Sequence, residues 1–335
     1  MLLAYISPLA FAATPPLLAA VSAFLILKAD QSKVSYLDAE DPAGWQRSQE
    51  WLIGAPIAKE LSHAHCNNAV VVACHPYSGD FGRSWRTLRR YDSVQSVTLY
   101  DDSMNKAIHS TAGNEYLKVM AAAYASLVPQ KKESRLDGEK KSILYLGLGG
   151  GTLPMLVNEP CDVIELDPDV VDMATKYCDV DCSFVNIHSG VDALNHSSVT
   201  PGPHSCVFVD VFGIDNNVPS GFVTQHFVQG IYDNLEENGV VLSNFHYGGN
   251  DAEEKRLQEG KVAYSNVFGS CLAIPSRFQR NMILCAKKEK TKNESSFDLE
   301  LALMIAKQKG WLFDPTVRLQ GWKRIKAKQN RLFPM

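Results

Sequence analysis

Strong net charge, paired-cysteine motifs and internal repeats are all missing from this chain of 335 residues. The formal net charge is only -4, which argues against a dedicated nucleic-acid binder, because such proteins present a basic surface. None of the eight cysteines forms a CxxC pair and no Cys/His set has zinc-finger spacing, so we expect no metal site. We expect reduced, structural thiols, which favour a compartment such as the cytosol over the exterior. With 45% hydrophobic and 21% charged residues, the composition excludes a disordered or fibrous protein.

Charged side chains are absent from the first 27 residues. The apolar run 2–27 is long enough to cross a bilayer as a helix, but Pro15 and Pro16 interrupt it. No Lys or Arg precedes the run, unlike a secretory signal, and Lys28 and Lys33 follow it. The positive-inside rule would therefore leave the main body facing the cytoplasm. A membrane anchor, a targeting peptide and an apolar helix packed on the domain all stay open.

The other end of the chain is basic. Residues 311–335 carry six Lys or Arg side chains against one acid, Asp314. Such a tail could contact anionic lipid or RNA, but a solvated terminal helix is the more ordinary interpretation.

Changes in composition divide the chain into five segments. We predict an apolar anchor or targeting segment over 1–30, a linker over 31–67, and a small β/α unit over 68–135. A nucleoside-binding core over 136–290 and a helical, basic tail over 291–335 complete the chain.

Apolar runs alternate with helical patterns through the core. The predicted strands are Ile143–Leu148, Asp162–Leu166, Ser183–Ile187, Cys206–Phe212 and Gly239–Phe245. Asp167 followed by Pro168 is a helix start, with an N-cap acid before a proline at the first helical position. Two further runs, Val262–Ala273 and Asn281–Ala286, predict a closing antiparallel pair. The pattern predicts an α/β fold, Rossmann-like and doubly wound, with a mainly parallel sheet.

A glycine-rich turn directly follows the first of these strands. It contains Gly147, Gly149, Gly150 and Gly151, and glycine there lets the backbone approach a ligand closely. Eighteen residues after Gly147, the second strand ends at Glu165. A carboxylate at that place can accept both ribose hydroxyls of an adenosine. Together the two features predict a nucleoside site.

Two more acids follow later strands. Asp192, next to Ala193, could receive an adenine amino group, or it could serve only at a helix start. Asp210 ends the fourth strand, and ligands of such sheets bind outside the carboxyl ends of the strands. We therefore assign the catalytic position to Asp210.

These motifs resemble the spermidine synthase-like branch, also called the polyamine biosynthesis domain, of the class I S-adenosylmethionine-dependent methyltransferase superfamily. The likeness covers roughly residues 91–286 and is carried by Leu146–Pro154, Ile164–Val171, Tyr91–Met120 and Phe268–Ala286. It implies a small N-terminal β-unit before the core. It also implies S-adenosylmethionine or its decarboxylated form as cofactor, with Gly147, Gly149, Gly150, Gly151, Glu165, Asp192 and Ala193 as the binding residues.

The sequence departs from true spermidine synthases where their diamine site would be. Their acid in the glycine turn corresponds to Gly150, and the second of their two acids after strand four corresponds to Gly213. Asp215 could replace that acid only in a rebuilt loop, and their Tyr-Gln pair aligns with Leu117 and Lys118. A diamine carries two ammonium charges whose desolvation needs carboxylates, so fewer acids and an added lysine favour methyl transfer.

We therefore expect a methyltransferase with a small-molecule or protein acceptor. Aminopropyl transfer and a non-catalytic binding or scaffold protein remain the alternatives. Nucleic acid is not an expected partner, whereas membrane association through residues 2–27 and a homodimer stay open.

Overall fold

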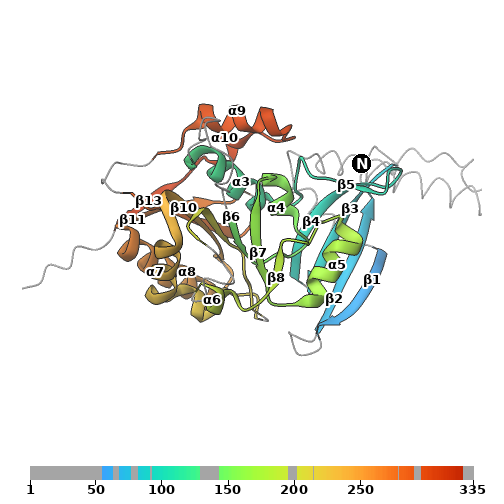
Figure 1. Cartoon of the computed structure of the whole chain (residues 1–335), viewed down its shortest axis with the longest axis horizontal. Coiled ribbons are helices and arrows are strands. Elements are labelled where there is room, and N and C mark those ends of the chain that lie inside the picture. Colours follow the sequence, from blue (N-terminus) through green and yellow to red (C-terminus); the bar gives the residue numbers. More distant parts are fainter. Residues whose placement is uncertain are drawn as a thin grey trace, which may run out of the picture.

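The computed structural model describes residues 55–62, 68–76, 82–90, 93–128, 143–194, 202–213, 215–277, 279–289 and 296–326. The apolar run 2–27 and the last nine residues of the basic tail lie outside this part of the chain. Within it, two sheets form separate layers, with helices around the larger sheet and one helix between the two (Figure 1).

The smaller sheet is an antiparallel meander of five strands. It runs in chain order through β1 (Ala55–Ser62), β2 (Asn68–Pro76), β3 (Arg83–Arg90), β4 (Ser93–Asp101) and β5 (Lys106–Ile108). Strand β1 falls in the range predicted as a linker. Its residues show no clean alternation, and its strand conformation comes from backbone pairing with β2, which a local pattern does not reveal.

The larger sheet has eight strands in the order β13-β11-β12-β10-β9-β6-β7-β8. Their bounds are β6 (Ile143–Leu146), β7 (Cys161–Glu165), β8 (Val185–Ile187), β9 (His204–Val209), β10 (Leu235–His246), β11 (Ser270–Pro275), β12 (Asn281–Lys287) and β13 (Lys323–Lys326). Strands β10, β9, β6, β7 and β8 are parallel, and β12, β11 and β13 continue the sheet antiparallel. The predicted Rossmann-like class is confirmed. Strand order reverses between β6 and β9, which is where such sheets bind ligands.

Helices cover both faces of the larger sheet. The helical elements are α3 (Glu115–Leu127), α4 (Thr152–Val157), α5 (Pro168–Cys178), α6 (Gly190–Ala193), the 3-10 helix η3 (Ser220–Val223), α7 (Gln225–Asn234), α8 (Asp251–Phe268), α9 (Leu299–Lys309) and α10 (Pro315–Arg318). One core lies under α3, α4, α9 and α10, and a second core lies under α7 and α8. As predicted, α5 begins after Asp167, whose side chain accepts from the Asp169 amide.

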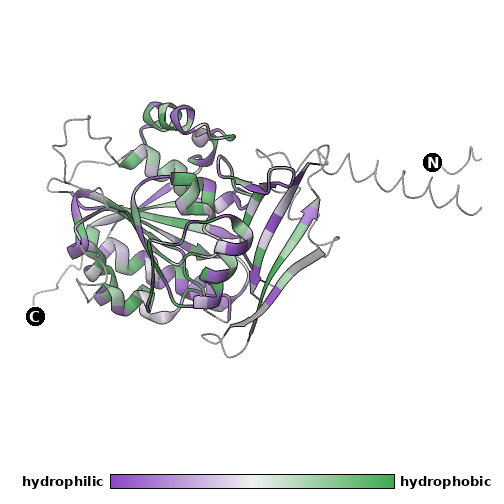
Figure 2. Cartoon of the chain, turned by 45° about the vertical axis from the view of Figure 1, so that its right-hand side comes forward, coloured by the Kyte–Doolittle hydropathy of each residue, from purple (hydrophilic) through white to green (hydrophobic). Residues whose placement is uncertain are grey.

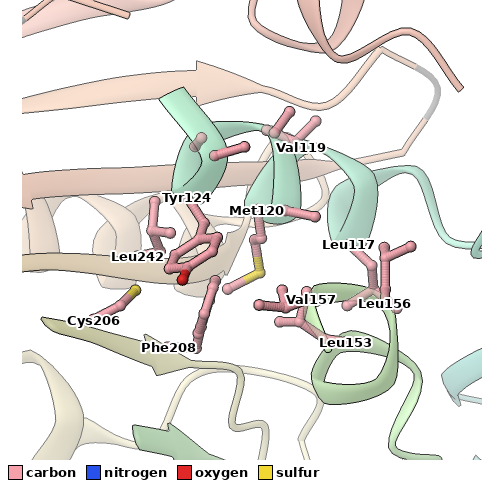
Figure 3. Close-up of a cluster of buried hydrophobic side chains, with 14 of the residues drawn as sticks. Leu117, Val119, Met120, Tyr124, Leu153, Leu156, Val157, Cys206, Phe208 and Leu242 are labelled. Carbon is pink, nitrogen blue, oxygen red and sulfur yellow. The ribbon is translucent and has the colours of Figure 1, made fainter. Parts of the chain in front are cut away.

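The first core centres on α3. Met120 and Tyr124 of α3 point toward Phe208 of β9, and Leu117 points toward Leu153 and other α4 side chains (Figure 3). Hydrophobic residues run along the strands of the larger sheet (Figure 2), as the continuous apolar runs predict for strands covered on both faces.

Two predictions about the end of the chain are wrong. Residues 262–268 form the last turns of α8, so the strand β11 starts only at Ser270. The run is apolar because Ala263 and Tyr264 of α8 pack on the sheet, and a short apolar run does not distinguish a helix from a strand. The tail is helical in part, through α9 and α10, but its basic end is not a solvated terminal helix where it is described, because Lys323–Lys326 form the edge strand β13 and Arg318 is buried.

Among the described residues, none of the helices is both long enough and apolar enough to cross a membrane.

Candidate functional site

A cavity of about 360 Å³ opens at the carboxyl ends of the parallel strands. Its walls come from the ends of β6, β7, β9 and β10, from the start of α3 and from the start of β4. The lining residues that carry the argument below are Gln95, Tyr116, Gly147, Gly149, Glu165, Ser189, Gly190, Asp210, Phe212, Asn216, Asn244 and His246. Four of the predicted site residues therefore share one cavity: Gly147, Gly149, Glu165 and Asp210.

The glycine turn needs glycine for steric reasons. Gly147 has a φ of +96°, and a Cβ built there would lie 2.3 Å from the carbonyl oxygen of Asp210. Gly151 has a φ of +69° and faces Val180, so it shapes the turn without lining the cavity.

Gly150 also lies outside the cavity lining. A Cβ at this position would lie 2.0 Å from the Ser96 hydroxyl oxygen of β4. A side chain at this position would therefore require the Ser96 hydroxyl to move.

Glu165 is tied to the glycine turn by backbone hydrogen bonds. Its Oε2 accepts from the Leu148 amide at 2.9 Å, and its Oε1 accepts from the Leu166 and Asp167 amides at 2.8 and 3.0 Å. Burial raises the pKa of this carboxyl, while the three amide donors act in the opposite direction. A carboxylate oxygen has two lone pairs, so Oε2 still has one for a ligand hydroxyl. The structure thus leaves room for one ribose contact, where the sequence predicted two.

Asp192 and Ala193 lie in the short helix α6, and neither lines the cavity. Asp192 is exposed, whereas its neighbours Ser189 and Gly190 do contribute to the wall. The adenine contact assigned to Asp192 and Ala193 stays a prediction.

Asp210 sits at the centre of a buried polar network. Its Oδ1 accepts from the Asn244 side-chain amide at 2.8 Å, and its Oδ2 lies 3.2 Å from the Tyr116 hydroxyl. The Asn244 carbonyl accepts in turn from the Asn281 amide at 2.9 Å. Burial raises the pKa of Asp210 to about 6, although both hydrogen bonds lower it. Asp210 therefore gains or loses its proton close to neutral pH.

His246 and Phe212 form a stacked aromatic pair beside Asp210, with ring centroids 4.4 Å apart. The Nδ1 of His246 lies 3.0 Å from the Asn216 carbonyl, which can only accept, so Nδ1 carries the hydrogen. Burial lowers the pKa of His246, which keeps the ring neutral at pH 7.

Sequence reasoning missed Tyr116, Asn244, Asn281 and His246. The signal for two of them was present, because Asn244 and His246 alternate at the end of a strand that was itself predicted. Tyr116 and Asn281 belong to elements that reach the cavity only through tertiary packing.

The role inferred for Lys118 is wrong. Its side chain is fully buried, 3.9 Å from Glu115 in an ion pair on the first turn of α3, and does not line the cavity. The residue that α3 contributes to the site is Tyr116, two positions earlier. Asp215 also stays outside the cavity, where it accepts from the Asn217 amide within its own loop.

The architecture matches a solved structure, a probable spermidine synthase from Corynebacterium glutamicum. The two chains align with a TM-score of 0.53 and 17% identity over 77% of this chain and 87% of the other. This likeness shows a spermidine synthase-like fold, which agrees with the resemblance seen in the sequence.

Sequence similarity points to methyltransferases. The chain is 27% identical over 185 residues to the eEF1A lysine and N-terminal methyltransferase of Xenopus laevis, an alignment that covers 50% of this chain and 26% of that protein. The human protein of the same name is 29% identical over 119 residues, which cover 31% of this chain and 17% of that protein. This chain thus spans about a quarter or less of the curated relatives it matches. No protein-family model matches it.

Proposed function

We propose that this protein is an S-adenosylmethionine-dependent methyltransferase that acts on an amine. The observation that carries the proposal is the half-buried carboxylate of Asp210, which shares one cavity with the glycine turn and Glu165. A volume of about 360 Å³ suits a small-molecule ligand. Glu165 retains a lone pair on Oε2 for a ribose hydroxyl.

When bound, S-adenosylmethionine supplies an electrophilic methyl group. The chain then has to hold an amine in line with that group and remove one proton from the ammonium. Asp210 suits the second task because its pKa of about 6 leaves it ionised at pH 7 yet able to take up a proton. The Phe212–His246 pair forms an aromatic wall beside it, which suits a cationic or alkylated amine.

The charges in the cavity favour methyl over aminopropyl transfer. Among the described residues that line it, Glu165 and Asp210 are the acids, and Glu165 already bonds three backbone amides. One carboxylate, Asp210, is then left for the acceptor. That suits a single ammonium better than a diamine, whose second charge would be desolvated without a partner.

For the acceptor we propose a protein amine. The curated relatives are named for modifying lysine and the N-terminus of eEF1A. eEF1A is therefore the first acceptor to test, with lysine and the N-terminal amine distinguished by mass spectrometry of the product.

Calorimetric titration tests the cofactor assignment. We expect the full chain to bind S-adenosylmethionine more tightly than its decarboxylated form, and not to bind NAD. Tighter binding of the decarboxylated form together with putrescine turnover would instead establish an aminopropyltransferase. Binding of no nucleoside at all would favour a scaffold protein.

The Asp210→Asn variant tests the catalytic assignment. Asparagine keeps the shape of the side chain but has no charge and no basicity. We expect affinity for S-adenosylmethionine to stay within threefold of wild type, and single-turnover methyl transfer to fall at least tenfold, about 1.4 kcal/mol in the barrier. An unchanged rate with a lowered melting temperature would remove Asp210 from the catalytic role and leave it a structural one.

A further inference from the structure

The polar network behind Asp210 has only one arrangement of its amides. A carboxylate only accepts hydrogen bonds, so Asn244 must turn its NH₂ group toward the Oδ1 of Asp210. The carbonyl oxygen of Asn244 then faces Asn281, which must present its own NH₂ group. Asn281 therefore donates a hydrogen bond to Asn244, and Asn244 donates one to Asp210.

Strand register places the two asparagines within reach of each other. Strands β10 and β12 pair antiparallel, with Asn244 opposite Ile283 and His246 opposite Asn281. Asn244 and Asn281 are thus diagonal neighbours on one face of the sheet. Both are almost fully buried, at 1% and 5% exposure, so water cannot readily replace either hydrogen bond.

We propose that Asn281 is a positioning residue, which fixes the orientation of the Asn244 amide and thereby keeps Asp210 ionised at neutral pH. Asn281 does not line the cavity and acts only through Asn244. Without Asn281, the Asn244 amide can turn its carbonyl toward Asp210 and accept a hydrogen bond from the protonated carboxyl, which would favour the neutral form of Asp210. The catalytic meaning of this arrangement rests on the proposed function, but the arrangement itself does not.

Three other ionisable side chains line the cavity around Asp210. Tyr116 lies on α3, and its hydroxyl also donates to the Gln95 carbonyl at 3.2 Å. From β7 comes Glu165, and from β10 comes His246, both of which line the same cavity. His246 lies opposite Asn281 in the strand register, but among the described residues none of these three side chains is hydrogen-bonded to the Asn281 side chain. The side-chain hydrogen bonds therefore connect Asn281 to Asp210 through Asn244.

The test measures the titration of Asp210 by carboxyl ¹³C NMR in the full chain without cofactor or acceptor. The signal is assigned by its disappearance in Asp210→Asn. We expect Asp210 to be at least a fivefold weaker acid in Asn281→Leu than in wild type. The isosteric Asn281→Asp variant places an acceptor where Asn281 donates to Asn244, so it should make Asp210 a still weaker acid. It also provides a second measurement if the leucine variant does not fold.

A double-mutant cycle separates positioning from direct electrostatics or general damage. In an Asn244→Leu background there is no amide to orient, so Asn281→Leu and Asn281→Asp should leave the titration of Asp210 within twofold of Asn244→Leu alone. An equal effect of the Asn281 substitutions in both backgrounds would overturn the proposal. So would an unchanged titration in Asn281→Leu.

Activity gives a second readout. With S-adenosylmethionine and eEF1A, Asn281→Leu should be at least fourfold slower than wild type at pH 5, where the ionised fraction of Asp210 limits the rate, and within twofold at pH 9, where Asp210 is ionised in both. A deficit of equal size at both pH values would contradict the positioning role. If wild type itself transfers no methyl group, the proposed function fails while the NMR result still decides the role of Asn281.

Discussion

At the residue scale, Glu165 joins the cavity to the glycine turn. Its spare lone pair on Oε2 predicts one strong ligand contact, and hydrogen bonds to a charged acceptor contribute about 1.5–3 kcal/mol each. We therefore expect Glu165→Ala to weaken S-adenosylmethionine binding at least tenfold in a calorimetric titration. An affinity within threefold of wild type would remove Glu165 from the site.

The same substitution also frees the amides of Leu148, Leu166 and Asp167. A loosened turn could lower affinity without any ribose contact, so Glu165→Gln is the matched control. The glutamine side-chain oxygen can still accept hydrogen bonds from the backbone amides, whereas its NH₂ group cannot. We expect the glutamine variant to restore the melting temperature more fully than it restores the affinity.

The raised pKa of Asp210 predicts an effect on stability as well as on rate. Its folded pKa of about 6 lies above the reference value of 3.8, so the fold disfavours the ionised form. The stability contributed by the protonated group is present below pH 3.8 and is lost as the pH rises through about 6, which corresponds to roughly 3 kcal/mol. Asparagine does not ionise and escapes this loss.

Urea unfolding of wild type and Asp210→Asn at several pH values measures the effect. Between pH 4 and pH 8, the difference in unfolding free energy should move in favour of the variant by up to about 3 kcal/mol. A difference that does not change with pH would mean that Asp210 titrates like an exposed carboxyl.

At the scale of elements, the turn between β6 and α4 holds the end of β9 close to the end of β6. Gly147 and Gly149 both have positive φ, but only Gly147 approaches the backbone, with its built Cβ 2.3 Å from the Asp210 carbonyl oxygen. At Gly149 the nearest atom, the Gln95 carbonyl oxygen, is 3.6 Å away.

We expect Gly147→Ala to lower the free energy of unfolding by more than about 2 kcal/mol, because the left-handed conformation and the clash add together. Gly149→Ala carries only the conformational term, about 1 kcal/mol. Chemical denaturation of the two variants side by side measures the contrast, and equal losses would contradict this account.

At the scale of the whole molecule, a buried ion pair joins the C-terminal helix α10 to the start of α3, next to the site. The Nε of Arg318, at the end of α10, lies 3.0 Å from Oε1 of Glu115, at the start of α3. Both side chains are buried, and burial raises the pKa of Glu115 against the opposing effect of Lys118 and Arg318. Glu115 directly precedes Tyr116, so α10 supports the helix end that supplies the Tyr116 hydroxyl.

Glu115 also faces Lys118, so removing Arg318 leaves its buried carboxylate with one of these two cations. We expect Arg318→Met to lower the unfolding free energy by about 3 kcal/mol, and the double variant Arg318→Met/Glu115→Gln to lose less than the sum of the two single variants. Thermal denaturation of both single variants and the double variant gives the coupling. Losses that add within about 0.5 kcal/mol would show that the two side chains do not interact.

Local patterns in the sequence determined the central elements of the larger sheet. Continuous apolar runs predict the buried strands β6 and β9, because a strand covered on both faces needs no polar side. The Asp167–Pro168 start of α5 is equally local, since an N-cap bonds to amides within its own first turn. The glycine turn, Glu165 and Asp210 were predicted because each directly follows such a strand.

Tertiary structure alone decided what surrounds those residues. Strand β13 exists because the distant strand β11 pairs with it, and strand β1 because the neighbouring strand β2 does; no local periodicity records either pairing. Lys118 and Tyr116 are two residues apart on α3, and only the packing of that helix directs Lys118 into the core and Tyr116 to the cavity. Asn281 reaches Asp210 through strand register. Such contacts depend on residues far apart in the chain, whereas caps and apolar runs depend on neighbours, so the sequence by itself determines the strands and the fold decides which side chains meet.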